Sequence, residues 1–343
     1  MMFMYLSSLL ALAEPPSQNL SPIINGVEAT EDDFPETGAM LMTGTISLFG
    51  GQELRTFVCS STLIAPDVVL LAAHCLDDFA FTFGMGEIED KEVFWSRQAD
   101  LTSWSDPQNT NPLPDGTIAA SDYVIHENFD LQSLQMGLAE NFDIALIFLA
   151  EPVLDIDHAF VPSIEENDAI TVGDEAIVVG WGQQIATSQF ESPPAGSYAI
   201  KQQGTSIISQ VADFEMHIGA AQTDVRKCHG DSGGPTFWDG GNGYRLIGVT
   251  SHAYDQSDCF ETGGVDTRVS YYREWIDAQM RSRCEDGTRS WCDTPGIVTP
   301  EYYEELEAAS KNACTHIQMK DISLWFVALL PFLLISRKKN QGT

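Results

Sequence analysis

The segment RKCHGDSGGPTF, residues 226–237, places one serine, Ser232, after a Gly-Asp pair and before Gly-Gly-Pro. Glycine permits positive φ and leaves room for another backbone segment, so this composition predicts a tight loop with an exposed serine. A serine hydroxyl is a weak nucleophile at neutral pH unless a base and an orienting group lie beside it. The segment therefore indicates a nucleophile only if the chain supplies such partners elsewhere.

Two earlier segments supply candidate partners. VVLLAAHC, residues 68–75, is an apolar run typical of a buried strand and carries His74 near its end. NFDIALIFL, residues 141–149, carries Asp143 as its only charge. Taken singly, the histidine fits a core position, the aspartate a turn and the serine an ordinary loop. Taken together, in the order His, Asp, Ser, they favour a catalytic set.

The motifs AAHC, DIAL and GDSGGP in this order resemble the chymotrypsin/trypsin family of serine proteases. The resemblance covers about residues 23–280 and implies an all-β fold of two six-stranded antiparallel barrels with a C-terminal helix. Many short β-branched runs separated by Gly, Pro, Asn and Asp agree with an all-β body. Further matching segments are IING at 23–26, CSSTLIAPDVVLLAAHC at 59–75, VVGWG at 178–182 and VDTRVSYYREWI at 265–276.

The resemblance also implies the roles of individual residues. His74 would accept the proton of Ser232 and return it to the leaving amine, while Asp143 would orient the imidazole. The backbone N–H groups of Gly230 and Ser232 would form the oxyanion hole. The chain is then a serine endopeptidase that cuts polypeptide substrates through an acyl-enzyme.

The acid before the serine predicts a zymogen. By resemblance, Asp231 receives the ammonium group of Ile23 after a propeptide is removed, because two buried charges are tolerated only as partners. Pro22 stands where family members typically have Arg or Lys. We therefore expect an activating peptidase that is not trypsin-like.

The family position at the floor of the substrate pocket lies six residues before the serine and is Arg226. A guanidinium there repels basic side chains and pairs with carboxylates, which predicts cleavage after Asp or Glu. Ala253 and Gly264 fall at wall positions and leave the pocket open. Alternatively, Asp266 neutralises Arg226 internally and the pocket prefers small or polar residues.

A third possibility is that Arg226 points away and a neighbouring charge, Asp224 or Lys227, takes its place. The first two versions share one expectation, which is that the enzyme does not have the specificity of trypsin for Arg or Lys.

The seven cysteines fit an exported, oxidised protein. The resemblance implies that Cys59 pairs with Cys75 and Cys228 with Cys259. Cys284 and Cys292 are predicted to form a disulfide that closes a small loop. Cys314 has no predicted partner.

Both ends of the chain predict export and attachment to a membrane. The apolar start with Ala-Leu-Ala at 11–13 is typical of a secretory signal. The apolar segment 322–335 is shorter than a full span but precedes three basic residues, as in bacterial C-terminal sorting tails; a buried core helix is the alternative. The predicted parts are a signal peptide at 1–13, a propeptide at 14–22, a protease domain at 23–282, an acidic linker at 283–321, a membrane or sorting segment at 322–335 and a basic cytoplasmic tail at 336–343.

The chain carries 50 acidic and 17 basic residues, a formal net charge of −33. This field excludes nucleic acid as a partner and indicates a solvated acidic surface. The acidic run EIEDKE at 87–92 is compatible with calcium but does not by itself specify a metal, so no cofactor or metal is predicted. A non-catalytic protein-binding module on the same scaffold is the alternative function, and the full set of catalytic residue types argues against it.

Overall fold

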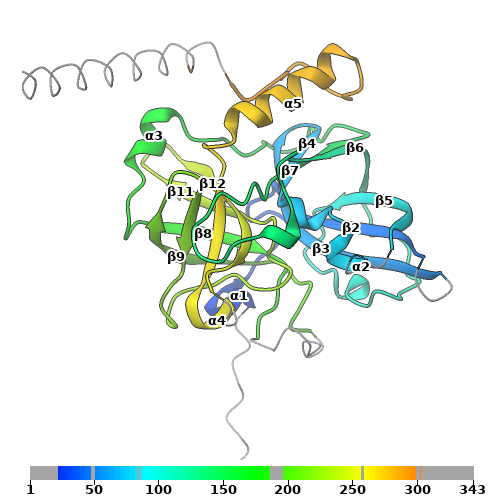
Figure 1. The fold of residues 1–343 in the computed structure, drawn as a ribbon, viewed down its shortest axis with the longest axis horizontal. Coiled ribbons are helices and arrows are strands. Elements are labelled where there is room, and N and C mark those ends of the chain that lie inside the picture. Colours follow the sequence, from blue (N-terminus) through cyan, green and yellow to red (C-terminus); the bar gives the residue numbers. More distant parts are fainter. Residues whose placement is uncertain are drawn as a thin grey trace, which may run out of the picture.

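Two antiparallel β-barrels lie next to each other in the computed structural model, with the earlier strands in one barrel and the later strands in the other (Figure 1). The structure describes residues 22–47, 51–82, 84, 86–185, 196–255, 259–298 and 302. This arrangement confirms the predicted all-β fold of two six-stranded barrels.

The first barrel closes in the strand order β2-β3-β4-β7-β6-β5. Its interior is filled by the apolar runs of the sequence, and Leu63, Val69 and Ile147 have no exposed surface. Apolar side chains leave water when the barrel closes, which is the main favourable contribution to its stability. Its strands are β2 (Thr37–Ile46), β3 (Gln52–Ala65), β4 (Val68–Leu71), β5 (Ile88–Ser96), β6 (Ile118–Ile125) and β7 (Ala145–Leu149).

The second barrel runs in the order β9-β10-β13-β12-β11-β8 and closes because β8 pairs with both β11 and β9. The short β1 (Val27–Glu28) adds to its edge on β9. The other strands are β8 (Glu175–Gly180), β9 (Gln202–Val211), β10 (Glu215–Ile218), β11 (Pro235–Asp239), β12 (Tyr244–Ala253) and β13 (Gly264–Arg268).

Helices are short except for α5 (Arg273–Glu285), the predicted closing helix. It follows the last strand of the second barrel but packs on the first, where Ile276 and Met280 join the core. Arg283 pairs with Asp122 of β6 at 2.8 Å. The remaining helical segments are α1 (Pro22–Asn25), α2 (Phe79–Thr82), α3 (Ile164–Ala169) and α4 (Cys259–Thr262), with 3₁₀ turns η2 (Ala73–Cys75), η3 (Thr102–Trp104) and η4 (Leu131–Ser133).

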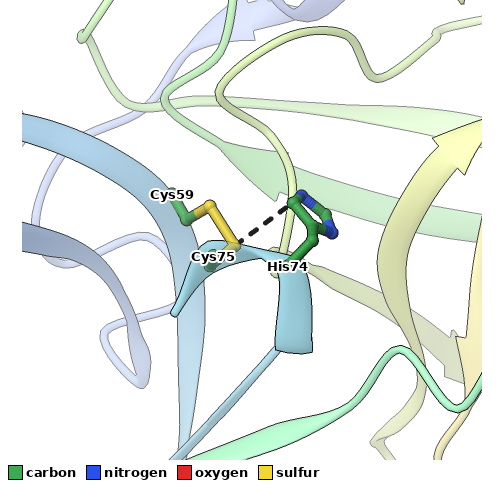
Figure 2. Close-up of side chains that lie close together, drawn as sticks. All are labelled: Cys59, His74 and Cys75. Carbon is green, nitrogen blue, oxygen red and sulfur yellow. Dashed lines mark hydrogen bonds between the residues drawn. A yellow bond between two sulfur atoms is a disulfide. The ribbon is translucent and has the colours of Figure 1, made fainter. Parts of the chain in front are cut away.

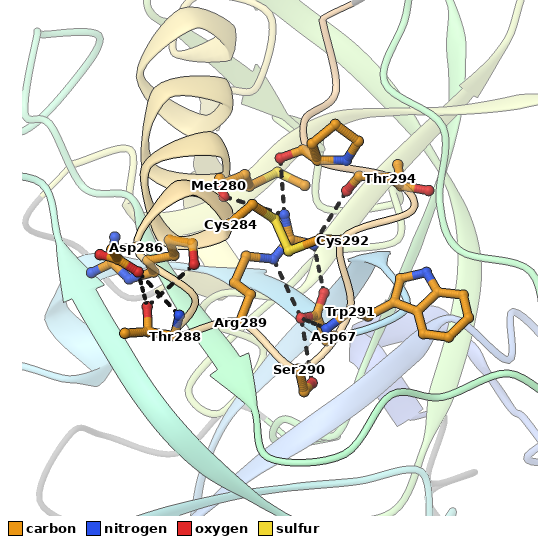
Figure 3. The surroundings of a disulfide bond; sticks show 12 residues. Asp67, Met280, Cys284, Asp286, Thr288, Arg289, Ser290, Trp291, Cys292 and Thr294 are labelled. Carbon is orange, nitrogen blue, oxygen red and sulfur yellow. Dashed lines mark hydrogen bonds and ion pairs between the residues drawn. A yellow bond between two sulfur atoms is a disulfide. The ribbon is translucent and has the colours of Figure 1, made fainter.

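The segment 283–298, expected to begin an acidic linker, instead lies against the first barrel (Figure 3). Arg289 and Asp67 form an ion pair at 2.6 Å with no side-chain exposure. The backbone N–H of Trp291 donates to the same carboxylate at 2.9 Å, and the Cys284–Cys292 disulfide closes the loop that carries the arginine. The folded body therefore extends beyond the predicted boundary at residue 282, because a buried charge pair fixes this loop.

Several predictions fall on residues outside the described ranges. These are the signal peptide at 1–13, the propeptide up to residue 21, the segment 322–335, the tail at 336–343 and Cys314. Within the described ranges, no helix has both the length and the apolar character needed to span a membrane.

Candidate active site

Partly buried His74 and fully buried Asp143 form a pair on the first-barrel side of the site. The 3₁₀ turn after β4 carries the histidine, and the aspartate immediately precedes the run that becomes β7. Nδ1 of His74 lies 2.8 Å from Oδ2 of Asp143, and the backbone N–H of His74 donates to Oδ1 at 2.9 Å. Because Nδ1 faces a carboxylate, it carries the proton, which leaves Nε2 as the basic nitrogen of the neutral ring.

The charge of Asp143 favours the protonated form of His74. Burial opposes the imidazolium, but the carboxylate beside it outweighs burial and raises the pKa of His74. Burial likewise opposes the ionised form of Asp143, but His74 and a hydroxyl donor hold the pKa of this carboxyl below its ordinary value. The pair is thus arranged to accept a proton at Nε2 and to stabilise the resulting charge.

The hydroxyl donor is Ser251, on β12 of the second barrel, and it donates to Oδ2 of Asp143. Sequence reasoning missed this residue. The signal available was the polar run Thr-Ser-His at 250–252 directly after the apolar run Leu-Ile-Gly-Val at 246–249. One carboxylate therefore takes donors from both barrels.

The predicted Cys59–Cys75 disulfide is present and ties β3 to the turn that carries His74, with 6.1 Å between the Cα atoms. Figure 2 shows the ring of His74 beside this bridge, with Nε2 3.9 Å from the sulfur of Cys75. Because both sulfurs are bonded to each other, they are not thiolate ligands for a metal. Among the described residues this is the one group of three or more His, Cys, Asp or Glu side chains whose ligand atoms lie close enough together to share a metal ion.

Cys284 and Cys292 also pair as predicted. Cys228 is disulfide-bonded, while the side chain of its expected partner, Cys259, lies outside the described part of the chain.

The loop of Ser232 is held from the first barrel by Ser60. The backbone N–H of Ser60 donates to the carbonyl of Ser232 at 2.9 Å, and its hydroxyl donates to the carbonyl of Gly230 at 3.0 Å. Gly233 has φ of +77°, and a Cβ there would lie 2.4 Å from the carbonyl oxygen of Ser60. This close approach explains the glycine that follows the serine in the motif.

Ser232 and His74 line the same cavity, which has a volume of about 240 Å³. Their side chains form no hydrogen bond with each other within the described ranges; such contacts are often long without substrate. In the same ranges, the N–H groups of Gly230 and Ser232 donate to no acceptor of the protein. The described lining consists of His74, Lys227, Cys228, His229, Ser232, Thr250, Ser251, His252, Ala253 and Gly264.

Asp231 is fully buried behind this loop. Its carboxylate accepts backbone N–H groups from Gly182 at 2.8 Å and Cys228 at 2.9 Å. A Cβ on Gly180 or Gly182 would lie within 2.5 Å of this side chain, which explains the two glycines of VVGWG. Asp231 makes no ion pair with a described residue, and burial raises its pKa to about 6.

Ile23, the expected partner of Asp231, is fully buried in the core of the second barrel. The next residue, Ile24, accepts the backbone N–H of Arg226 at 3.0 Å. Ile23 has φ of +37°, which is unfavourable for a β-branched residue. Its nitrogen is bonded to Pro22 in this chain, so it carries no ammonium group.

The pocket charges differ from those expected. Arg226 is absent from the described lining; it is 4% exposed and donates to the carbonyl of Gln222 at 3.0 Å. Asp266 pairs with Lys227 and not with Arg226, so the predicted internal pair is wrong in its cation. Lys227 also donates to Thr236 at 2.8 Å.

Lys227 lines the cavity together with Ala253 and Gly264. This agrees with the third possibility given above, in which Lys227 takes the place of Arg226. Its ammonium is buried, which lowers its pKa, and the carboxylate of Asp266 opposes this effect. The charges behind the cavity wall therefore cancel.

Comparisons with known proteins give one family. The sequence pattern of the family described as Trypsin matches residues 23–276. A vitellin-degrading protease of Bombyx mori is 29% identical over 229 residues, 65% of this chain and 76% of that protein. Brachyurin of Leptuca pugilator is 26% identical over 272 residues, 75% of this chain and 98% of that protein.

Chymotrypsin-like elastase family member 1 of Macaca fascicularis is 27% identical over 277 residues, 73% of this chain and 93% of that protein. All three relatives come from animals, so they give no support to the bacterial type expected from the tail.

Proposed function

Because this chain belongs to the trypsin family of serine proteases, we propose that it is an exported serine endopeptidase whose catalytic triad is His74, Asp143 and Ser232. The observation that carries the proposal is the lining of one cavity by Ser232 and by a histidine whose other ring nitrogen is held by a buried carboxylate. This is the arrangement that activates a serine hydroxyl.

The proposed reaction has two balanced halves. Oγ of Ser232 attacks the scissile carbonyl carbon while Nε2 of His74 takes its proton. The C–N bond then breaks, the amine leaves with that proton, and an ester to Ser232 remains. Water attacks the ester by the same route and releases the acid. The N–H groups of Gly230 and Ser232 stabilise the oxyanion in each half, where one such donor contributes about 10²- to 10³-fold in rate.

A serine-directed fluorophosphonate tests this proposal. We expect the activated protein to be labelled at Ser232 and to hydrolyse peptide esters, and Ser232→Ala and His74→Ala to lose both properties. Ser121→Ala, which alters an exposed serine on β6, is the matched control and should behave as wild type. An unlabelled wild-type protein that folds and has the correct N-terminus would favour the binding-module alternative.

We propose that the protein is made as a zymogen activated by cleavage between Pro22 and Ile23. The buried carboxyl of Asp231, which pairs with no cation in the part of the chain that the structure describes, supports this, as does the strained backbone of Ile23 before cleavage. N-terminal sequencing of the active form should give Ile-Ile-Asn-Gly. Full activity with any other N-terminus would overturn this part.

For specificity, we propose a preference for small or uncharged polar side chains before the scissile bond. The support is the buried Lys227–Asp266 pair at the cavity, which offers no net charge. We place an acidic preference, expected from Arg226, second, because that side chain donates to Gln222 and lies outside the described lining of the cavity.

Profiling cleavage of a peptide library tests the preference. Wild type should cut after small or uncharged residues. Lys227→Gln should add cleavage after Arg and Lys, because it leaves the carboxylate of Asp266 without its cation. Arg226→Gln is the control and should keep the wild-type profile. Strong wild-type cleavage after Asp or Glu that disappears in Arg226→Gln would assign the pocket to Arg226 instead.

Export, a signal peptide at 1–13 and a membrane attachment through 322–335 complete the proposal. The disulfides support an oxidising compartment. Fractionation of cells that express the chain with and without residues 322–343 tests the attachment; equal release of both forms would exclude it.

A further inference from the structure

We propose that Glu215 is a positioning residue for Asp143. Glu215 begins β10 of the second barrel, and its side chain is 99% buried, since only 1% of its surface is exposed. Its two oxygens accept hydrogen bonds from the first-barrel segment that leads into Asp143. This inference rests on the proposed triad and adds to it a residue that does not contact the reacting atoms.

The contacts define a clamp between the barrels. Oε2 of Glu215 accepts the backbone N–H of Ala139 at 2.8 Å, and Oε1 accepts the side-chain amide of Asn141 at 3.0 Å. The same amide donates to the carbonyl of Gln135 at 3.0 Å and accepts its N–H at 2.8 Å. One buried carboxylate thus fixes both the path of residues 135–141 and the side chain two positions before Asp143.

The backbone between this clamp and Asp143 is strained. Phe142 has φ of +55°, a left-handed conformation that a bulky non-glycine residue adopts only when its surroundings impose it. Its ring stacks on His126 with 5.1 Å between centroids. The clamp before Phe142 and the hydrogen bond from Thr267 to the carbonyl of Asp143, at 3.0 Å, bracket the strained residue. Releasing the clamp allows the segment to relax and displaces the carboxylate that orients His74.

The charge of Glu215 sets the strength of the clamp. Burial, with the nearby carboxylates of Asp143 and Asp266, raises its pKa to about 8, although the two N–H donors oppose this. Burial, and then the negative charges of Glu140 and Glu215, raise the pKa of the Tyr272 phenol. Below about pH 8 one oxygen carries a proton and accepts poorly; above it, both accept as charged partners, which bind more strongly.

The experiment follows kcat of the activated protein between pH 6 and 10. Wild type should show two rises, one from His74 and a second near pH 8 from Glu215. Glu215→Gln should lose the second rise and lower kcat about tenfold above pH 8, because an amide offers only one acceptor oxygen. Glu140→Gln alters an exposed glutamate one residue from Asn141 and is the matched control, with the wild-type profile expected.

Two results separate this inference from the proposed function. If wild type is active but shows a single rise, and Glu215→Gln matches Glu140→Gln, the clamp is overturned and the triad stands. If wild type is inactive, the proton resonance of His74 Nδ1–H in the full-length protein decides: a shift centred near pH 8 supports the clamp, and its absence overturns it. This measurement needs no variant and so does not depend on the folding of Glu215→Gln.

Discussion

Asp143 and Asp231 are both fully buried carboxyls of the candidate site, and they are compensated differently. Asp143 accepts donors from His74 and Ser251, and its pKa lies below its ordinary value. From the described residues Asp231 accepts two backbone N–H groups, and burial raises its pKa to about 6. Asp143 has its charge partner in the uncleaved chain, whereas Asp231 pairs with no cation of the described residues.

This difference suggests how the proposed zymogen works. The His74 side of the site is assembled by the first barrel and by Ser251 without any processing. The loop that carries Ser232 depends on a carboxyl that binds a proton readily and gains a cation only when Ile23 is freed. Desolvating a carboxylate without a partner costs several kcal/mol, so a new ammonium group is the strongest available means of ordering this loop.

The largest effect is expected from removing the charge of Asp143, the carboxyl that is paired with His74. Asp143→Asn keeps the size of the side chain but no longer fixes the proton on Nδ1 of His74, so kcat should fall about 10⁴-fold. Hydrolysis of a peptide ester by the activated variant measures this. Asp155→Asn, on an exposed residue paired with Arg97, is the control and should retain activity. A loss smaller than about tenfold for Asp143→Asn would mean that this pair is structural.

The second largest effect on kcat is expected from changing Asp231, the carboxyl behind the loop that carries Ser232. In the cleaved protein, Asp231→Asn removes the partner of the Ile23 ammonium, and the oxyanion loop should lose its conformation. We expect kcat to fall about 10²- to 10³-fold, the contribution of oxyanion donors. In the uncleaved protein the same change should leave the low basal activity nearly unaltered. Equal losses in both forms would contradict the role of cleavage.

The third effect concerns stability. A carboxyl whose pKa is higher in the folded than in the unfolded state binds its proton more tightly when folded, so it favours folding at low pH. In the uncleaved chain, the contribution of Asp231 is therefore lost as pH rises from its ordinary pKa of 3.8 to about 6. This two-unit shift corresponds to roughly 3 kcal/mol of unfolding free energy.

Urea unfolding of uncleaved wild type and Asp231→Asn between pH 4 and 7 measures this term, because their difference cancels the background from the net charge of −33. After cleavage the slope of the difference should reverse, since an ammonium partner lowers the pKa of the carboxyl. If the difference in unfolding free energy between wild type and Asp231→Asn does not change with pH in either form, the pKa of Asp231 is not shifted. The contrast drawn between Asp143 and Asp231 would then be wrong.

The sequence motifs predicted the two-barrel fold, which the structure confirms. They also named His74 and Ser232 as candidate residues, and these line one cavity. The sequence was less informative where a role depends on which of two neighbours faces the cavity. Arg226 and Lys227 are adjacent basic residues, and only the path of the loop, with Asp266 opposite, determines that the lysine lines the cavity. Composition cannot distinguish the two.

Long-range contacts were also beyond the sequence. Asp67 and Arg289 lie 222 residues apart, and nothing in the acidic stretch after residue 282 indicates that one arginine is buried. Ser251 lies in the polar run Thr-Ser-His of β12, and nothing in that run indicates which carboxylate its hydroxyl contacts. These residues act through pairing across the two barrels, which appears in three dimensions only.

The smallest effect tests how much Ser251 of the second barrel contributes to holding the carboxylate of Asp143. Ser251→Ala removes one donor to Asp143 but keeps both contacts from His74. A hydrogen bond to a charged group contributes about 1.5 to 3 kcal/mol, so kcat should fall roughly ten- to a hundredfold. Ser251→Thr retains a hydroxyl and should recover most of the activity. If alanine and threonine behave alike, the hydroxyl contributes nothing to Asp143, and its carboxylate is held from the first barrel alone.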